Sequence, residues 1–118
     1  MRLVIDQIPP SNNKYMGRGR KGDQFKYQED KQLWSGLILQ AAQRKHKPPE
    51  CKCIVSITYY FPTKGRRDPD NYSGKFILDG LVNCGILRDD SFDHVILELI
   101  GGYDKSYPRT EIMITEAP

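Results

Sequence analysis

The sequence predicts a small α/β (α+β) fold in which a mixed β-sheet carries two helices, in the order β-α-β-α-β-β. Two segments place apolar residues at helical spacing, and four short segments are rich in β-branched and aromatic residues, as strands are. Proline and glycine mark most boundaries between these segments. Because 118 residues suit one hydrophobic core, we expect residues 1–118 to form a single domain that needs no metal or disulfide to fold.

Four segments are predicted to be strands. Residues 2–8 form the first, which a proline pair ends, and residues 51–61 form a long strand expected at the centre of the sheet. Residues 94–100 and 109–116 form the last two, and the alternation of isoleucine with polar residues in 109–116 is typical of a half-buried strand. The Gly-Gly pair and the polar loop between them predict that these two strands pair as an antiparallel hairpin.

Two segments are predicted to be helices. Residues 29–45 place apolar side chains, including Trp34, at helical spacing, so this face is expected to pack in the core. Residues 73–82 form a shorter helix with a narrow apolar face, and Gly85 is expected near its end because glycine is the usual residue there. The chain has no internal repeat, low-complexity tract or glycine-rich nucleotide-binding motif.

The composition permits nucleic-acid binding without requiring it. The formal net charge is +3 and the pI about 8.8, so the distribution of charge matters more than its total. Cys51, Cys53 and Cys84 lack the spacing of common zinc sites and are expected to be free thiols, which favours a reducing, cytoplasmic setting. With no secretory leader and no apolar run long enough to span a bilayer, we expect a soluble protein.

Two acidic clusters bracket the second predicted helix. Pro69 lies between Asp68 and Asp70 and biases Asp68 toward an extended conformation, in which residues i and i+2 project to the same side. These two carboxylates can therefore converge, and Asp90 could join them if the chain turns back after the helix. Three carboxylates beside arginine and lysine form a plausible oxygen cage for a hard divalent cation.

A purely structural interpretation of the same residues stays open. The sequence Asp-Pro-Asp-Asn is common in turns, and Asp70 or Asn71 could cap the following helix. Asp89 and Asp90 could likewise form a solvated turn with Ser91. The residues alone do not decide between a metal site and two turns.

Residues 14–22 combine four cations with three glycines, which predicts a mobile basic loop. The cations are Lys14, Arg18, Arg20 and Lys21. Such a loop can place positive charge on phosphates, while Tyr15, Phe25 and Tyr27 could stack on exposed bases. The alternative is a flexible, solvated loop that binds nothing.

Four motifs follow one another along the chain: PPSNN at 9–13, RRDPDN at 66–71, LDGL at 78–81 and GILRDD at 85–90. In this combination the chain resembles the RusA family of Holliday junction resolvases over nearly its whole length. The resemblance implies a magnesium-dependent endonuclease, with manganese as a possible substitute ion. It also implies a homodimer that cuts four-way DNA junctions by paired symmetric nicks during recombination and repair.

The resemblance also assigns individual residues. It places the metal-binding catalytic aspartates at Asp68, Asp70 and Asp90 and a supporting lysine at Lys75. Two departures are visible, one extra residue before Lys75 and a longer connection after Asp90, so neither Asp93 nor His94 receives a role. The expected DNA-binding residues are those of the basic segments: Lys14, Arg18, Arg20, Lys21, Arg66 and Arg67.

Two other classes of function remain open. A non-catalytic module could bind branched DNA through the basic loop and the aromatic residues without cleaving it. A phosphohydrolase or glycosyltransferase could also use an Asp-x-Asp motif. That class would need a larger scaffold, and the phosphohydrolase motif usually follows a buried strand directly, whereas residues 62–67 intervene here.

Overall fold

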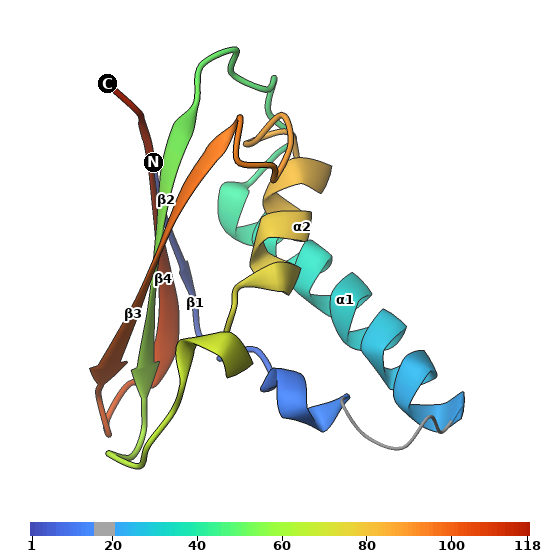
Figure 1. Cartoon of the computed structure of the whole chain (residues 1–118), viewed down its shortest axis with the longest axis vertical. Helices are drawn as coiled ribbons and strands as arrows, with labels where there is room; N and C mark the ends of the chain where they lie inside the picture. Colours follow the sequence, from blue (N-terminus) through green and yellow to red (C-terminus); the bar gives the residue numbers. More distant parts are fainter. Residues whose placement is uncertain (16–20) are drawn as a thin grey trace.

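A computed structural model of the chain describes residues 1–15 and 21–118, with side chains from residue 24 onward in the second range. The predicted order of strands and helices is confirmed, and two short 3-10 helices are added to it (Figure 1). The elements are β1 (Arg2–Ile5), η1 (Asn12–Lys14), α1 (Lys21–Ala42), β2 (Cys53–Phe61), η2 (Pro69–Asn71), α2 (Lys75–Asn83), β3 (Val95–Tyr103) and β4 (Arg109–Glu116).

The four strands form one mixed sheet in the order β1-β4-β2-β3. β2 pairs with β3 in parallel and with β4 in antiparallel orientation, so the prediction of a central second strand is confirmed. The predicted hairpin of β3 and β4 is wrong, because β2 lies between these two strands. The connection from β3 to β4 crosses the end of β2, where Asp104 N donates a hydrogen bond to Phe61 O (2.9 Å).

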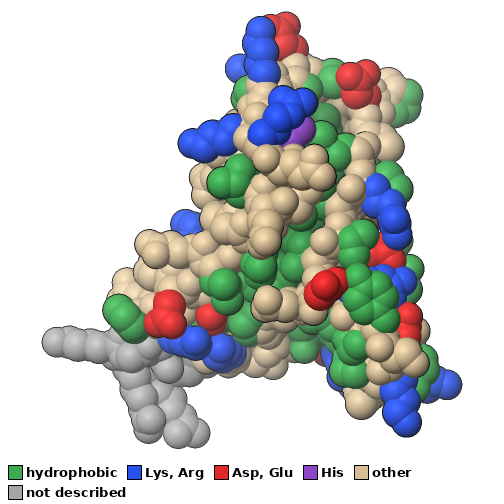
Figure 2. Space-filling view, turned by 180° about the vertical axis from the view of Figure 1, so that it is seen from behind, with side chains coloured by type: hydrophobic (Ala, Val, Ile, Leu, Met, Phe, Trp, Pro, Cys, Tyr) green, Lys and Arg blue, Asp and Glu red, His purple; other side chains and the backbone are tan. Residues whose placement is uncertain are grey.

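Both helices cover one face of the sheet, and no helix of the described residues covers the other face (Figure 1). Along β2, every second side chain is buried beneath the helices, from Cys53 to Phe61. Trp34 and Ile38 of α1 and Ile77 of α2 fill the space between the layers and are almost fully buried. The predicted core position of Trp34 is therefore confirmed. Seen from behind, apolar side chains run along the seam between the layers, and many lysines and arginines lie at the margins (Figure 2).

The first helix begins earlier than its apolar pattern predicted. α1 starts at Lys21, eight residues before the predicted start, and its first turns carry few buried side chains; Phe25, for example, is 71% exposed. The amino-terminal part of α1 thus extends beyond the core and shows no apolar stripe. The predicted basic loop at 14–22 is accordingly too long, since Lys14 belongs to η1 and α1 has begun by Gly22.

A glycine closes the end of α2, as predicted. Gly85 has a left-handed φ of 82°, and a Cβ at this position would lie 1.8 Å from the backbone oxygen of His46. The same contact includes a hydrogen bond from His46 N to Cys84 O (2.7 Å). The end of α2 is therefore joined to the segment after α1 by a backbone-to-backbone contact that leaves no room for a side chain at Gly85.

Within the described residues, no helix is long and apolar enough to cross a membrane. Cys51, Cys53 and Cys84 are free thiols, and the last two are buried, as predicted. Burial raises the pKa of the Cys53 and Cys84 thiols above the ordinary value, which keeps both protonated near neutral pH.

Replacement of Gly85 by alanine tests the close contact at the end of α2. Gly85→Ala is expected to lower the free energy of unfolding by about 2–4 kcal/mol, because it combines backbone strain with a clash that only backbone movement can relieve. Gly36→Ala is the matched control, since Gly36 lies inside α1 with nothing near its Cβ position. Urea unfolding should show Gly36→Ala unchanged or stabilised by up to about 1 kcal/mol. Equal effects of the two changes would contradict the account.

Candidate active site

The first acidic cluster follows the carboxyl end of β2. Asp68 has an extended backbone (φ −107°, ψ 141°), as predicted for a residue before proline, and η2 begins at Pro69. Asn71 N donates a hydrogen bond to Asp68 O (3.0 Å), and Tyr72 N donates to Pro69 O (3.1 Å). The cluster therefore lies in a well-defined turn after the central strand, a place where rigid scaffolds commonly present functional residues.

One interpretation of the Asp-Pro-Asp-Asn motif was that Asp70 or Asn71 caps α2. Neither residue does so. The residue before α2 is Gly74, whose φ of 81° is left-handed, and none of the described side chains caps the helix. A Cβ at Gly74 would lie 2.8 Å from Ile57 Cδ1, so both the backbone and the packing require glycine. Asp70 and Asn71 belong to η2 instead.

The amino-terminal PPSNN motif holds η2 in place. Asn12 Nδ2 donates a hydrogen bond to Asp70 O (2.8 Å) and another to Ser73 Oγ (3.1 Å). η1, which begins at Asn12, therefore packs against η2 although almost 60 residues separate them. This motif has a structural role in positioning the acidic cluster.

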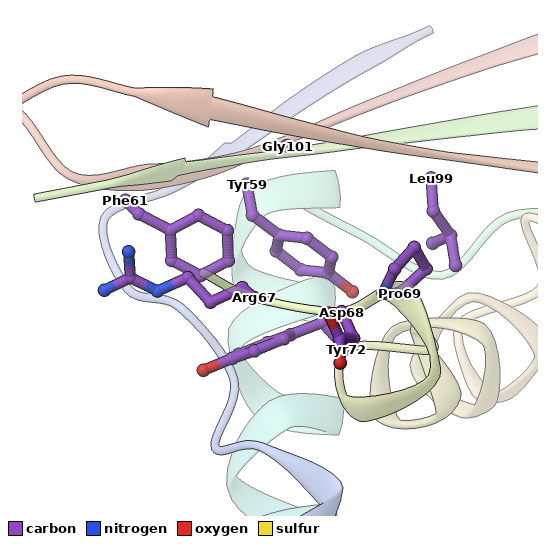
Figure 3. Close-up of a pocket in the computed structure, with 8 residues that line it drawn as sticks. All are labelled: Tyr59, Phe61, Arg67, Asp68, Pro69, Tyr72, Leu99 and Gly101. Carbon is purple, nitrogen blue, oxygen red and sulfur yellow. The ribbon is translucent and has the colours of Figure 1, made fainter. Parts of the chain in front are cut away.

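Asp68 lines a small pocket between η2 and the sheet (Figure 3). Tyr59 and Phe61 enter it from β2, and Tyr72 lies opposite them. The Tyr59 hydroxyl is buried and has no hydrogen-bond partner among the described residues. Burial raises the pKa of Tyr59, so its hydroxyl stays protonated and can donate a hydrogen bond.

The two predicted arginines differ in how firmly they are held. Arg67 donates hydrogen bonds to Thr63 O (2.8 Å), Thr63 Oγ1 (2.7 Å) and Gly65 O (3.1 Å), and its guanidinium lies 4.4 Å from the ring centre of Phe61. Arg66 is largely exposed and forms an ion pair with Asp68 (Nε to Oδ1, 3.0 Å). Arg67 is thus fixed beside the Asp68 pocket, while Arg66 is available to solvent.

The predicted supporting lysine lies at the same end of the molecule. Lys75 is the first residue of α2 and is exposed, next to Pro9 and Pro10 at the rim of a shallow hollow. The extra residue in this chain falls in the segment that ends at Gly74, whose left-handed backbone sets the start of the helix. Lys75 is therefore placed on the η2 side of α2.

The second acidic cluster lies beyond the other end of α2. Asp90 N donates a hydrogen bond to Asp89 Oδ1 (2.9 Å), and this bond lowers the pKa of Asp89. Asp90 also lines a hollow with Asp79 and Lys31. Asp79 Oδ2 is buried there without a hydrogen bond among the described residues, and Lys31 Nζ lies 3.9 Å from it.

Within one chain the structure does not bring Asp90 to Asp68 and Asp70. The nine residues of α2, about 13 Å of helix, separate η2 from the connection that holds Asp90. Because β2 and β3 are parallel, this connection reaches β3 at the end of the sheet opposite to η2 (Figure 1). Among the described side chains, those of residues 1–15 and 24–118, no group of three His, Cys, Asp or Glu residues could hold a metal ion.

One of the predicted DNA-binding cations already has a partner. Lys14 Nζ lies 3.2 Å from Asp30 Oδ2. Asp30 is a buried residue of α1, and its Oδ1 lies 3.4 Å from Lys26 Nζ. Burial acts to raise the pKa of Asp30, but hydrogen bonds from Tyr15 and Lys14 outweigh it and lower that pKa overall. Arg18 and Arg20 lie outside the described residues, as does the side chain of Lys21.

Two of the three aromatic residues predicted to stack on bases are part of the fold. Tyr15 packs edge-on against Tyr27 (5.2 Å between ring centres) and near Phe76 of α2 (5.9 Å). Burial and the hydrogen bond to Asp30 raise the pKa of Tyr15. The prediction of base stacking is thus not supported for Tyr15 and Tyr27, while Phe25 is exposed.

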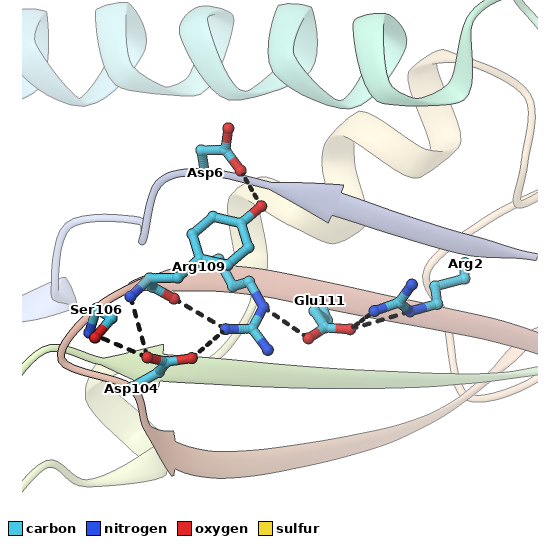
Figure 4. A network of polar contacts seen from close by, with 7 residues as sticks. Arg2, Asp6, Asp104, Ser106, Arg109 and Glu111 are labelled. Carbon is cyan, nitrogen blue, oxygen red and sulfur yellow. Dashed lines mark hydrogen bonds and ion pairs between the residues drawn. The ribbon is translucent and has the colours of Figure 1, made fainter.

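A polar network at the start of β4 was missed by sequence reasoning (Figure 4). Arg109 donates hydrogen bonds to Asp104 Oδ2 (2.9 Å) and Glu111 Oε2 (2.8 Å), and Arg2 of β1 bonds the same glutamate. The Arg109 guanidinium also lies 3.9 Å from the ring centre of Tyr60. The i and i+2 spacing of Arg109 and Glu111 on one strand face was the signal that could have indicated it.

The comparison with known protein families decides the identity of the chain. The family model described as Endodeoxyribonuclease RusA matches residues 7–115. The chain belongs to the RusA family. RusA proteins are endodeoxyribonucleases that resolve Holliday junctions, so this chain is an enzyme of that class. No curated protein matches the chain.

The donors around η2 suit the hard metal ions that RusA nucleases in general depend on. Asp68 and Asp70 offer carboxylate oxygens on one turn, with no thiol or imidazole among the pocket residues. Mg²⁺ is commonly bound by one or two carboxylates together with water and substrate phosphates. The two aspartates on η2 are therefore of a chemical type that fits such an ion.

The contacts of Asp30 predict how the free energy of unfolding depends on pH. Asp30→Asn is expected to lower the free energy of unfolding by about 1–3 kcal/mol at neutral pH, because Lys14, Tyr15 and Lys26 lose a charged partner. The folded pKa of Asp30 is lower than its unfolded value. Its stabilisation is therefore present above about pH 4 and is lost as the pH falls through the lower, folded pKa.

Urea unfolding of the wild type and of Asp30→Asn from pH 7 to pH 2 checks this. The difference between the two free energies should shrink below about pH 4. A difference that does not change with pH would show that Asp30 is not the titrating group.

Proposed function

We propose that the chain is a magnesium-dependent endonuclease that works as a homodimer and resolves four-way DNA junctions by paired, symmetric nicks. The family match over residues 7–115 carries the reaction class. The observation that supports the site is the anchored turn of η2, which presents Asp68 and Asp70 at the end of the central strand beside Arg66 and Arg67. A twofold dimer with one site per subunit matches the approximate twofold symmetry of a four-way junction.

In this proposal Asp68, Asp70 and Asp90 are the metal ligands. Bound magnesium, or manganese in its place, would polarise the phosphodiester and lower the pKa of water. Asp68 and Asp70 neutralise part of the ion's charge and fix its position relative to the strand end. Arg66, exposed and already beside Asp68, holds a phosphate oxygen of the DNA.

Lys75 is proposed to stabilise the negative charge that develops on the phosphoryl oxygens. It is exposed at the start of α2 and takes part in no ion pair among the described residues, so it can move toward a phosphate. Arg67 is the second candidate, but three hydrogen bonds hold its guanidinium on the turn at Thr63 and Gly65. Arg67 then serves the site mainly by keeping this turn in place.

The basic residues of segment 14–21 are proposed to hold the DNA arms. Lys14 can exchange part of its pairing with Asp30 for a phosphate, since its side chain is 42% exposed. Arg18, Arg20 and Lys21 remain proposed phosphate contacts on the sequence alone. The free thiols fit a reducing, cytoplasmic setting for this activity.

A non-catalytic module that binds branched DNA is the second candidate. One observation favours it: the three aspartates do not form one group within a single chain. Such a module would bind four-way junctions in a salt-sensitive manner and cleave nothing.

Replacement of Asp70 separates these two candidates. Asp70→Asn removes a charged ligand and little volume, so it should abolish cleavage of a labelled four-way junction in magnesium while leaving folding and junction binding nearly intact. Asp93→Asn is the matched control, because Asp93 is also exposed but has no assigned role, and it should cleave like the wild type. Cleavage should stop in EDTA.

Two results would contradict the assignment. If the wild type binds junctions tightly but cleaves none with any divalent metal, the chain is a binding module. If Asp70→Asn loses binding and cleavage together, Asp70 has a structural role and not a catalytic one.

Lys75→Ala is expected to slow cleavage by about 10- to 1,000-fold at saturating protein, with junction affinity changed much less, because the lysine acts mainly on the transition state. Single-turnover rates on a pre-bound junction measure this directly. An unchanged rate would move the role to Arg67 or to Lys64, which also lies on the loop after β2.

A further inference from the structure

The carboxyl end of β3 has a gap in its row of side chains beside the Asp68 pocket. Because β2 and β3 are paired in register, Leu99, Gly101 and Tyr103 of β3 lie on the helical face of the sheet, as the buried side chains of β2 do. Gly101 has the middle position of these three and fills none of the space above it. Among the described residues, nothing lies within 4 Å of a Cβ placed at Gly101, so this space is open to a ligand.

The gap joins two hollows at this end of the sheet. The first is the Asp68 pocket, which Gly101 lines from β3 (Figure 3). The second lies over the ends of β2 and β3 and reaches Lys64 and Tyr103. Three residues line both hollows, namely Phe61, Arg67 and Gly101. The two hollows thus form one groove, the Gly101 groove, which runs from Asp68 to Lys64 and Tyr103.

The end of the Gly101 groove farthest from Asp68 is positively charged and aromatic. The described residues that line it include Lys64 and Arg67 but no carboxylate. Lys64 Nζ lies 5.0 Å from the ring centre of Tyr103 and forms no ion pair with any described residue. Tyr103 is 45% exposed. Proteins that hold unpaired nucleic acid combine cations, which contact phosphates, with aromatic side chains on which bases stack.

The position of the groove connects this chemistry with the proposed cut. A DNA strand whose phosphate lies at Asp68 and Asp70 has its neighbouring nucleotide beside the groove, because the groove begins at Asp68. A base inside a duplex is stacked and paired, and taking it out of the stack costs free energy. At a branch point the stack is interrupted, so this cost is lower there. The groove therefore suits a base that branched DNA exposes more readily than duplex DNA does.

We propose that the Gly101 groove binds one unstacked nucleobase next to the phosphate that is cut. Gly101 leaves room for the base, Tyr103 supplies the stacking face, and Lys64 moves from the Tyr103 ring to the adjoining phosphate. Because every base has a face that can stack, the groove distinguishes unstacked from stacked nucleotides and not one base from another. The inference rests on the proposed function for the place of the cut, and it adds a source of selectivity for branched DNA over duplex DNA.

Removal of single bases from the DNA tests the base site. A series of four-way junctions, each lacking the base at one pair of symmetry-related positions near the branch point, is bound to the wild type and to Tyr103→Ala in EDTA, so that no strand is cut. At the position that enters the groove, loss of the base should weaken binding of the wild type by about 5- to 100-fold. Tyr103→Ala should bind the complete junction more weakly by a similar factor and should change little when the same base is removed.

Three further variants separate stacking from other effects. Tyr103→Phe keeps the ring and should bind like the wild type. Gly101→Val fills the gap and should weaken binding of the complete junction as Tyr103→Ala does, although the Tyr103 ring remains. Tyr107→Ala is the matched control and should bind like the wild type. Tyr107 is also exposed, at 44%, but its hydroxyl donates to Asp6, and it is not among the described residues that line the groove.

Three results would overturn the proposal: no position at which loss of a base weakens binding, equal effects of base loss on the wild type and Tyr103→Ala, or binding by Tyr107→Ala as weak as that by Tyr103→Ala. None of these results depends on cleavage. If the wild type cleaves junctions in magnesium but base loss and Tyr103→Ala act independently, the proposed function stands and the base site fails. If the two effects are coupled and no divalent metal supports cleavage, the proposed function fails and the base site stands.

Discussion

The parallel pairing of β2 with β3 is the constraint on which the arrangement of this molecule depends. A chain that leaves β2 can enter a parallel neighbour only after returning along the whole sheet, and α2 makes that return. The acidic motif before α2 and the acidic pair after it are therefore kept at opposite ends of the sheet. A rearrangement of the loop around Asp90 alone would not carry this residue along the length of α2 to Asp68. The same crossover leaves β3 at the edge of the sheet.

The remaining packing serves to fix the end of β2. Asn12 holds η2 by its backbone, Gly74 allows α2 to start close to the sheet, and Arg67 folds back on the preceding turn. These three contacts meet beside Asp68. The result is an acidic turn held in place next to a buried tyrosine hydroxyl that can still donate a hydrogen bond.

Local sequence predicted the elements better than their pairing. The apolar alternation of β2 and β4 and the narrow face of α2 depend on burial by the layer next to them, and the structure confirms these elements. The start of α1 could not be predicted, because its first turns extend past the core and bury too little to leave an apolar pattern. The hairpin prediction failed because the residue pattern of β3 and β4 fits two arrangements equally well. The two strands could pair with each other, or they could pair with opposite sides of β2, as they do. Likewise, the RRDPDN and GILRDD motifs identified the two acidic clusters. The distance between the clusters depends on strand order, which residue spacing does not reveal.

The separation of the two acidic clusters within one chain is tested most directly by a distance measurement. Spin labels on Lys64→Cys and Phe92→Cys of the same chain, in a Cys51→Ser background, report this distance, since both positions are exposed and lie next to the two clusters. Dilution with unlabelled protein removes any contribution from distances between chains. The distance is expected to exceed the length of α2, about 13 Å of helix. A distance clearly shorter than this would contradict the separation of the clusters by strand order.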